Sequence, residues 1–505
     1  MIFFVNQYLL TNNSSIEHAE MKRLKLFKQF DAPASLVLRD YLPLLDQNLK
    51  RFGVARDSVI DMFDFFAGAT DYPVHKCHVE DLHFSNEYQV SSGNNFREVK
   101  NGDRLVAEVH FIGGEVALVD HVDYFDDAGN LTLRKVYDCR GFMSKMETFG
   151  LDGNKFYESY HRPDGSIYLE SYYVKSVQNT PINSRWVLPN YRGHQWCFDS
   201  QDDLFTFFLD ELNHAHGDNN VFIADRPAIA INPVLNMASK VQRYLWMAIP
   251  EVNGGNDLKK GPFNAMIQNA LVNHAKDWAG IITMTAAQKE NLEQRLGKKH
   301  APITVISGSP VPTDRQHVAM DDRDRHHVIY VGRLGGDKQI DRLLRAFQQV
   351  HNRVQDATLT IYGYGDQQEV QSYQNLQQQL GLAGVINFAG YQPDVDLAYD
   401  QAGLLMDASA SDVQPLAMAE ALSHGVPVVS FDYQYGPAEL VENDVNGYLV
   451  HVNDEDKLAR QAVKILTDSD LQDRLSAGAY DHWADISDDQ TMAEWRTILP
   501  ATSQK

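Results

Sequence analysis

The chain has 505 residues, of which 44% are hydrophobic and 22% are charged. This composition is typical of a globular protein, and the length favours two or three domains. The net charge of −23 excludes nucleic acid as an expected partner, because sequence-independent binding to a polyanion needs a basic surface.

The cysteine usage and the N-terminal residues both favour a cytoplasmic location. Cys77, Cys139 and Cys197 are far apart and odd in number, so they predict neither a disulfide framework nor a metal site, and they favour a reducing environment. The start, MIFFVNQYLL, is apolar but has no basic region before it, which predicts a buried strand rather than a signal peptide. We find no apolar run of about 18 residues, and we expect a cytoplasmic protein without a membrane span.

The N-terminal segment, residues 1–69, has an α/β pattern. Met21, Leu24 and Phe27 have the spacing of one helix face. The predicted elements are a strand at 2–5, a helix at 16–30 and a strand at 35–39.

From about 70 to 205 apolar residues recur at every second position. This period, with turn signals such as Gly113-Gly114 and Asp152-Gly153, predicts an antiparallel meander. A sheet of this kind has edges and an exposed face, so it can serve in assembly or in docking of an acceptor molecule. A purely structural insertion is the alternative interpretation. The predicted strands are 104–112, 115–124, 131–137, 155–160 and 167–174.

Residues 205–320 return to alternating strands and helices, and the polar stretch 314–325 predicts a linker. The predicted elements are a helix at 204–213, strands at 221–224 and 241–249, a helix at 262–277, and strands at 280–284 and 303–306.

Residues 326–480 alternate most regularly, which predicts a parallel, doubly wound sheet. The predicted strands are 327–331, 358–362, 385–388, 404–406, 427–431 and 448–450, with a last helix at 488–499.

The stretch from Ser411 to Phe431 predicts a loop, a helix, a stop at Gly425 and a buried strand. Asp412 and Gln414 are cap-type residues, and Pro415 suits a first helical turn. A helix start offers unpaired N–H groups and a partial positive charge, which together suit a phosphate. A carboxylate further along the helix can accept hydrogen bonds from a ribose diol. The competing interpretation is an ordinary amphipathic helix with a surface glutamate.

Other polar or glycine-rich residues follow the predicted strands, where ligands bind in doubly wound sheets. Arg and Lys suit a diphosphate, as a fork and as a point charge, and glycines permit a close approach of the ligand. These residues are Gly332-Arg333-Leu334 with Lys338, Gly363-Tyr364-Gly365, and Gly390-Tyr391.

In combination, these motifs resemble the retaining glycosyltransferases of family 4, which have the GT-B fold. The predicted meander and the segment Phe431–Pro437 resemble more narrowly the poly(glycerol-phosphate) α-glucosyltransferases of wall teichoic acid. They also resemble the paired cytosolic glycosyltransferases that modify Ser-rich adhesins in Gram-positive bacteria. The resemblance covers most of the chain.

The resemblance implies two Rossmann-like, doubly wound domains with an antiparallel β-meander inserted in the first. Residues 1–69 and 206–320 would form the first, acceptor-binding domain, and 70–205 the meander. Residues 321–482 would bind the nucleotide sugar, and 483–505 would pack back on the first domain.

The resemblance also assigns roles to residues of this chain. Catalytic roles would fall to Asp412, Glu420, Arg333 and Lys338. Arg333 and Lys338 would hold the donor diphosphate, Glu420 the ribose, and Asp412 with the amides of Leu416 and Ala417 the donor sugar. The donor-binding set would also include Gly363, Gly365, Tyr391 and Ser15. No metal or other cofactor is expected, since the UDP-sugar is a co-substrate and cationic side chains and helix amides can take the charge of the diphosphate.

Three departures from the family pattern bear on activity. Asp412 stands where the family usually has Glu, and its reach is shorter by about 1.5 Å. The N-terminal turn from Asn13 to His18 lacks the usual glycines. The stretch Leu245–Val252 lacks the family's histidine, and His18 and His274 are candidates by residue type only.

Three functions therefore stay open. The first is a transferase that moves a hexose or N-acetylhexosamine from a UDP-sugar to protein Ser/Thr or to a cell-wall polymer. The second is a non-catalytic partner that binds acceptor and stabilises a paralogous transferase. The third and least favoured is an epimerase or phosphorylase on the same fold. The negative charge favours a protein or neutral acceptor over a polyanionic one, and we expect a homo- or hetero-oligomer that forms with a paralogue through the meander.

Overall fold

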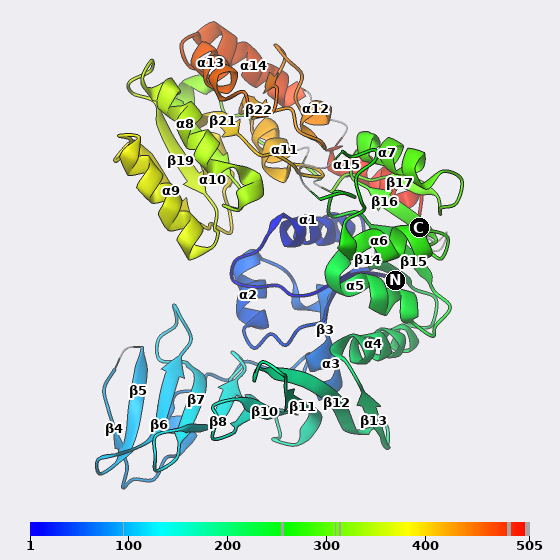
Figure 1. The fold of residues 1–505 in the computed structure, drawn as a ribbon, viewed down its shortest axis with the longest axis vertical. Coiled ribbons are helices and arrows are strands. Elements are labelled where there is room, and N and C mark those ends of the chain that lie inside the picture. Colours follow the sequence, from blue (N-terminus) through cyan, green and yellow to red (C-terminus); the bar gives the residue numbers. More distant parts are fainter. Residues whose placement is uncertain (94, 254–256, 309, 313–314, 482–485, 500–505) are drawn as a thin grey trace.

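The computed structural model describes residues 1–93, 95–253, 257–308, 310–312, 315–481 and 486–499. These residues form three sheets, of seven, ten and six strands, and Figure 1 shows how the sheets are arranged. The first and third are parallel, and each forms a Rossmann-like unit with its helices, called here the first and the second unit. The second sheet is an antiparallel meander inserted in the first unit. The predicted fold class is confirmed. Among the described residues, no helix has both the length and the apolarity that a bilayer crossing requires.

The seven-stranded sheet has the order β17-β16-β15-β14-β1-β2-β3. Its central strands, β1 and β14, are apolar apart from Asn6, as is typical of strands covered on both faces, and every residue of both strands is buried. The strands are β1 (Ile2–Asn6), β2 (Ala34–Leu38), β3 (Val59–Asp61), β14 (Val221–Ala224), β15 (Gln242–Trp246), β16 (Gly280–Thr283) and β17 (Ile303–Val305).

Helices cover both faces of this sheet (Figure 1). They are α1 (Ser15–Gln29), α2 (Leu45–Phe52), α3 (Met62–Ala67), α4 (Gln201–Ala215), α5 (Pro227–Asn236), α6 (Ala265–Gln268), α7 (Ala286–Leu296) and α15 (Asp488–Arg496). Short helical turns lie at Arg56–Ser58, Val79–Leu82 and Met320–Asp322, and a π-helical turn lies at Asn269–Asn273.

The ten-stranded meander lies between α3 and α4, with its strands adjacent in chain order. One face of its outer strands packs Val109 and Val122 against the preceding loop, at Cys77 and Val79. The strands are β4 (Gln89–Val90), β5 (Phe96–Asn101), β6 (Arg104–Phe111), β7 (Val119–Phe125), β8 (Leu131–Tyr137), β9 (Met143–Phe149), β10 (Lys155–His161), β11 (Ile167–Lys175), β12 (Pro181–Tyr191) and β13 (His194–Phe198).

The strand predicted at 115–124 is wrong in its first part, because a turn occupies that part. The amide of Glu115 donates to the carbonyl of Ile112, and Ala117 has a φ of 53°, so β7 begins only at Val119.

The six-stranded sheet has the order β20-β19-β18-β21-β22-β23. In chain order this is 3-2-1-4-5-6, the doubly wound arrangement in which ligands bind where the order reverses, here between β18 and β21. The strands are β18 (Asp324–Val331), β19 (Thr358–Tyr362), β20 (Ile386–Gly390), β21 (Ala402–Asp407), β22 (Val428–Phe431) and β23 (Gly447–Val450). The helices are α8 (Ile340–His351), α9 (Gln367–Gln379), α10 (Asp396–Gln401), α11 (Leu416–Ser423), α12 (Pro437–Leu440), α13 (Glu455–Leu466) and α14 (Ser469–Asp481), with a short turn at Gly336–Lys338.

The segment predicted as a linker, 314–325, has its first residue outside the described residues, and it lies between β17 of the first sheet and β18, which begins at Asp324. Arg323 is buried, and its guanidinium donates to the carbonyls of Tyr399, Val318 and His424. The helix predicted at 262–277 is only α6 and the π-helical turn that follows, because it starts at its cap Asn264 and ends before His274.

The last helix, α15, packs on the first sheet. The Trp495 ring is fully buried; it lies parallel to the Trp246 ring at 5.6 Å and edge-on to the rings of Phe4 and Phe27. A residue close to the C-terminal end of the chain therefore completes the core beside β1.

We expect Trp495→Ala to destabilise the chain by about 3–5 kcal/mol, since it leaves a cavity in a buried aromatic cluster. The midpoint of denaturant unfolding measures the loss. Trp196→Ala is the matched control, because Trp196 is 40% exposed and its removal leaves no closed cavity. Equal losses for the two variants would contradict a core role of Trp495.

Candidate functional site

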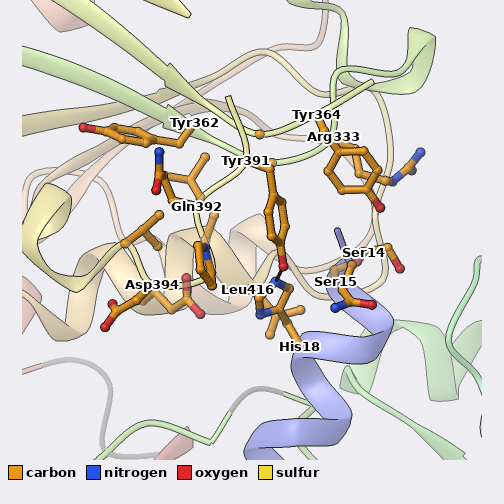
Figure 2. Close-up of a pocket in the computed structure, with 18 of the residues that line it drawn as sticks. Ser14, Ser15, His18, Arg333, Tyr362, Tyr364, Tyr391, Gln392, Asp394 and Leu416 are labelled. Atoms are coloured by element: carbon orange, nitrogen blue, oxygen red, sulfur yellow. Dashed lines mark hydrogen bonds between the residues drawn. The ribbon is translucent and has the colours of Figure 1, made fainter. Parts of the chain in front are cut away.

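A cavity of about 630 Å³ lies between the two Rossmann-like units. Its floor is the edge of the six-stranded sheet at the carboxyl ends of β18, β19 and β21, and the N-terminal part of α1 faces it from the first unit (Figure 2). Residues that are far apart in the sequence thus meet at the point where the strand order reverses. The predicted site residues that line the cavity are Ser15, Arg333, Lys338, Gly363, Tyr391, Asp412, Leu416, Ala417 and Glu420.

An ion pair joins two of the loops at this edge. Lys338 is 9% exposed, and its Nζ lies 2.7 Å from Oδ2 of Asp412. Burial alone would lower the pKa of Lys338, but the carboxylates of Asp412 and Asp407 outweigh burial and raise it. Lys338 is therefore a fixed positive charge beside the start of α11.

The predicted capping of α11 by Asp412 or Gln414 is wrong. The N-cap residue is Pro415, and α11 has no side-chain cap. Asp412 accepts a hydrogen bond from the amide of Val413, and Oε1 of Gln414 accepts one from the amide of Gly308 in the first unit. The start of α11 thus faces the cavity without a side-chain acceptor of its own, as an anion-binding helix start requires.

Glu420 is held from both sides. Its Oε1 lies 2.6 Å from Nζ of Lys22, which comes from α1, and its Oε2 accepts a hydrogen bond from the Tyr399 hydroxyl at 2.9 Å. Burial raises the pKa of Glu420, but Lys22 and the Tyr399 hydroxyl outweigh burial and lower it. Glu420 is therefore an anion whose charge is compensated by Lys22 of the first unit.

His18 lies in the cavity, although the sequence favoured a structural role for it. Its Nε2 is 2.9 Å from the Tyr391 hydroxyl, a contact between the two units that Figure 2 draws as a dashed line. Burial is the main cause that lowers the pKa of His18, with Glu420 opposing it and Lys22 adding to it. His274 is exposed and bonds to Asp277, away from the cavity.

The N-terminal turn without glycines has a helix-capping role. Ser14 is the N-cap of α1 and forms a capping box with Glu17. Glu17 in turn contacts Arg226. This places Ser14 and Ser15 against the cavity with a fixed backbone (Figure 2).

The two predicted glycines are needed for packing. A Cβ on Gly363 would lie 1.8 Å from the carbonyl oxygen of Gly332, and one on Gly365 would lie 2.8 Å from that of Leu334. Gly363 lines the cavity, whereas Gly365 is not among the lining residues. Each lets the loop after β19 lie against the loop after β18.

Arg333 lies at the rim rather than in the floor. Its side chain is 44% exposed, and its guanidinium lies 3.1 Å from Oδ2 of Asp337. Its carbonyl accepts a hydrogen bond from the Tyr330 hydroxyl, which fixes the backbone at this point.

Sequence reasoning missed Asp407 and Tyr433. Asp407 ends β21, is buried, and accepts hydrogen bonds from the hydroxyls of Ser409 and Tyr433. Burial raises its pKa, against the lowering effect of Lys338. The signal was present, because Asp407 directly follows the strand predicted at 404–406.

Among the described residues, two groups have the spacing of a metal site. They are His110 with His121 and Asp123, and Asp46 with Asp138 and Cys139. Neither group lines the cavity.

Comparison with known families gives two matches. Residues 5–386 match the model of an accessory Sec system protein, and residues 314–482 match the model described as glycosyl transferases group 1.

Three relatives are transferases by name. The poly(glycerol-phosphate) alpha-glucosyltransferase of Bacillus subtilis is 21% identical over 75% of this chain and 55% of its own length, so the chain spans about half of that protein. The GtfA subunit of the Streptococcus gordonii UDP-N-acetylglucosamine–peptide N-acetylglucosaminyltransferase is 22% identical over 99% of this chain and 98% of its own. The poly(ribitol-phosphate) alpha-N-acetylglucosaminyltransferase of Staphylococcus aureus is 21% identical over 99% of both.

Solved structures share the whole fold. S. aureus TarM, crystallised with UDP, has a TM-score of 0.82 at 20% identity and covers 98% of this chain and 99% of its own. Pneumococcal GtfA, crystallised with UDP and GlcNAc, has a TM-score of 0.84 at 18% identity over 98% and 97%. A GtfA/B complex has a TM-score of 0.78 at 20% identity and covers 100% of each chain.

Two Rossmann-like units with a cavity between them define the GT-B fold, and the second unit matches the model of group 1 glycosyl transferases. The chain itself belongs to the accessory Sec system protein family, whose model matches more than half of it.

The environment of His18 predicts opposite pKa changes for two substitutions. Glu420→Gln removes the anion that favours the imidazolium, so the pKa of His18 should fall further below its ordinary value. Lys22→Met removes a repelling cation, so that pKa should rise. A pH titration of the His18 ring protons by NMR, assigned with His18→Asn, measures both. Shifts of the same sign in the two variants would contradict the arrangement.

Proposed function

We propose that the chain transfers a hexose or N-acetylhexosamine from a UDP-sugar to a protein hydroxyl or a cell-wall polymer, with retention of the anomeric configuration. The observation that carries the proposal is the meeting of Lys338, Asp412, Glu420 and the uncapped start of α11 around one cavity.

The donor diphosphate would lie at the start of α11. The amides of Leu416 and Ala417 and the charge of Lys338 are suited to it, because together they supply hydrogen-bond donors and positive charge at one place. Arg333 is 44% exposed at the rim, and from there its guanidinium can donate two hydrogen bonds to a phosphate. These groups would stabilise the charge that develops on the leaving diphosphate.

The nucleoside would lie between Glu420 and Tyr391. Glu420 is an anion that can accept hydrogen bonds from both ribose hydroxyls, and the loops after β19 and β20 approach each other closely at Gly363 and Gly390. The base would therefore contact the backbone beside Tyr391. Asp412 would turn toward the donor sugar while still bonded to Lys338.

The acceptor would enter from the side of the first unit. The relatives named above act on both kinds of acceptor, a peptide and a polyol-phosphate polymer. We favour the peptide, because a chain with a net charge of −23 would repel a polyanion at long range.

The meander would carry the contact with a paralogous subunit. Its strands β10, β11 and β12 expose Phe156, Val174 and Ile182, which are 49%, 56% and 52% exposed. Exposed apolar residues on adjacent strands favour association. A chain of similar fold was crystallised in a GtfA/B complex, which supports an assembly of this kind.

The test is transfer of radiolabelled sugar from UDP-GlcNAc and from UDP-glucose by the purified chain, with and without a paralogue from its host. We expect transfer that falls at least 100-fold in Glu420→Ala, because the ribose contact and the orientation of the donor are lost. Glu290→Ala, at an exposed site on α7, is the matched control.

Two outcomes separate the alternatives. Transfer by the chain alone, lost in Glu420→Ala, supports an autonomous enzyme. Transfer that needs the paralogue and is insensitive to Glu420→Ala would overturn the proposal and make this chain the non-catalytic partner.

The ion pair between Lys22 and Glu420 gives a separate prediction. If Glu420 holds the ribose, Lys22 competes with the nucleotide for it, so Lys22→Met should bind UDP more tightly, by up to about fivefold for a partly exposed pair. Calorimetric titration with UDP measures this. Lys25→Met, an exposed residue on the same helix, should leave the affinity unchanged. Weaker binding in Lys22→Met would mean that Lys22 contacts the nucleotide and does not compete with it.

A further inference from the structure

We propose that Glu108, His110, His121 and Asp123 form a binding site for a divalent transition metal on the meander. The site lies on β6 and β7, in the outer part of the ten-stranded sheet and away from α1 (Figure 1). It is independent of the proposed transfer reaction.

The strand register places the four side chains on one face. His110 pairs with His121 and Glu108 with Asp123 across the antiparallel strands. Residues two apart on a strand share a face, and directly opposed residues are neighbours. The sequence thus builds a two-by-two array of imidazoles and carboxylates.

The distances in this array suit a metal better than a hydrogen bond. Nε2 of His110 is buried and has no hydrogen-bond partner among the residues that the structure describes, and a carboxylate oxygen of Glu108 is 3.4 Å away. Two ligand atoms that are each about 2.0–2.2 Å from a tetrahedral zinc ion are themselves roughly 3.4 Å apart. The ligand atoms of His110, His121 and Asp123 already lie within 4.8 Å of one another.

His121 is arranged as metal-binding histidines are. Its Nδ1 lies 2.7 Å from Oδ2 of Asp120, so Nδ1 carries the proton and Nε2 is left as the electron-pair donor. A carboxylate behind a histidine fixes the ring and raises its basicity toward a metal.

Asp123 is oriented by Arg134, whose Nε and Nη2 donate to its two carboxylate oxygens at 2.6 and 2.7 Å. Each oxygen keeps a lone pair, so one can bind a metal while Arg134 holds the group in place. Two imidazoles and two carboxylates favour zinc or a neighbouring first-row ion over calcium or magnesium, which prefer oxygen ligands alone.

The competing explanation is a stack of rings without a metal. The His110 and His121 rings are parallel with centroids 4.3 Å apart, and Phe96 stacks on His110 at 5.7 Å. Stacking accounts for the ring planes, but within the described part of the chain it leaves the buried Nε2 of His110 without a hydrogen-bond partner, which costs free energy. Metal binding would satisfy that atom after rotation of the rings.

The test uses the full chain after treatment with EDTA and dialysis. We expect ZnCl2 to bind with a stoichiometry of one and to raise the unfolding temperature, and CoCl2 to give the intense visible absorption of tetrahedral cobalt. His110→Asn and His121→Asn should each weaken zinc binding at least tenfold. His194→Asn is the matched control, since this exposed histidine lies on β13 of the same sheet.

Circular dichroism and the midpoint of denaturant unfolding verify that the variants are folded. Absence of saturable zinc binding by the wild-type chain would overturn the proposal. So would zinc binding that persists in both His110→Asn and His121→Asn, because that would place the metal elsewhere.

Discussion

The buried ion pair between Lys338 and Asp412 is the contact on which the cavity depends. A buried ammonium group is costly unless a carboxylate accompanies it, and Lys338 satisfies this with Asp412 at 2.7 Å and Asp407 nearby. The pair joins the loop after β18 to the loop before α11, which flank the reversal of strand order. The start of α11 and the ends of the strands are thereby brought to one edge, where a diphosphate can be met by charge and by amides together.

The first unit contributes through α1, and buried polar contacts fix that helix. Arg23 contacts Asp225, and Glu20 contacts Asn6, at the ends of β14 and β1. Burial raises the pKa of Glu20 well above its ordinary value, and the nearby Asp225 carboxylate adds to this. With one face of α1 held in this way, its other face presents His18 and Lys22 at defined positions opposite Tyr391 and Glu420.

The sequence predicts what local pattern and strand order determine. The alternation of strands and helices predicts the parallel sheets, and apolar residues at every second position predict the meander. Residues that follow parallel strands lie close together, because these strands end at one edge of the sheet. It does not predict contacts between units: His18 looked structural because nothing local places it opposite Tyr391. The prediction that Asp412 or Gln414 caps α11 is wrong for the same reason, because Gln414 bonds instead to Gly308, which is 106 positions away in the chain. Strands such as β9 are also missed, because the sequence MSKMETF does not alternate between apolar and polar residues.

The family is named after an accessory secretion protein, whereas the second unit matches a glycosyltransferase model, so the site must decide between transfer and a supporting role. A protein with only a supporting role gains nothing from charges that line a cavity between two units, because each charge loses hydration there. Here Lys22, Glu420, Lys338 and Asp412 satisfy one another in pairs around that cavity. Lys338 and Asp412 come from loops at the strand-order reversal, Glu420 comes from α11 and Lys22 from the opposite unit. Each pair can open to bind a ligand of mixed polarity. A nucleoside diphosphate sugar, with a diol at one end and a diphosphate in the middle, matches that distribution of charge.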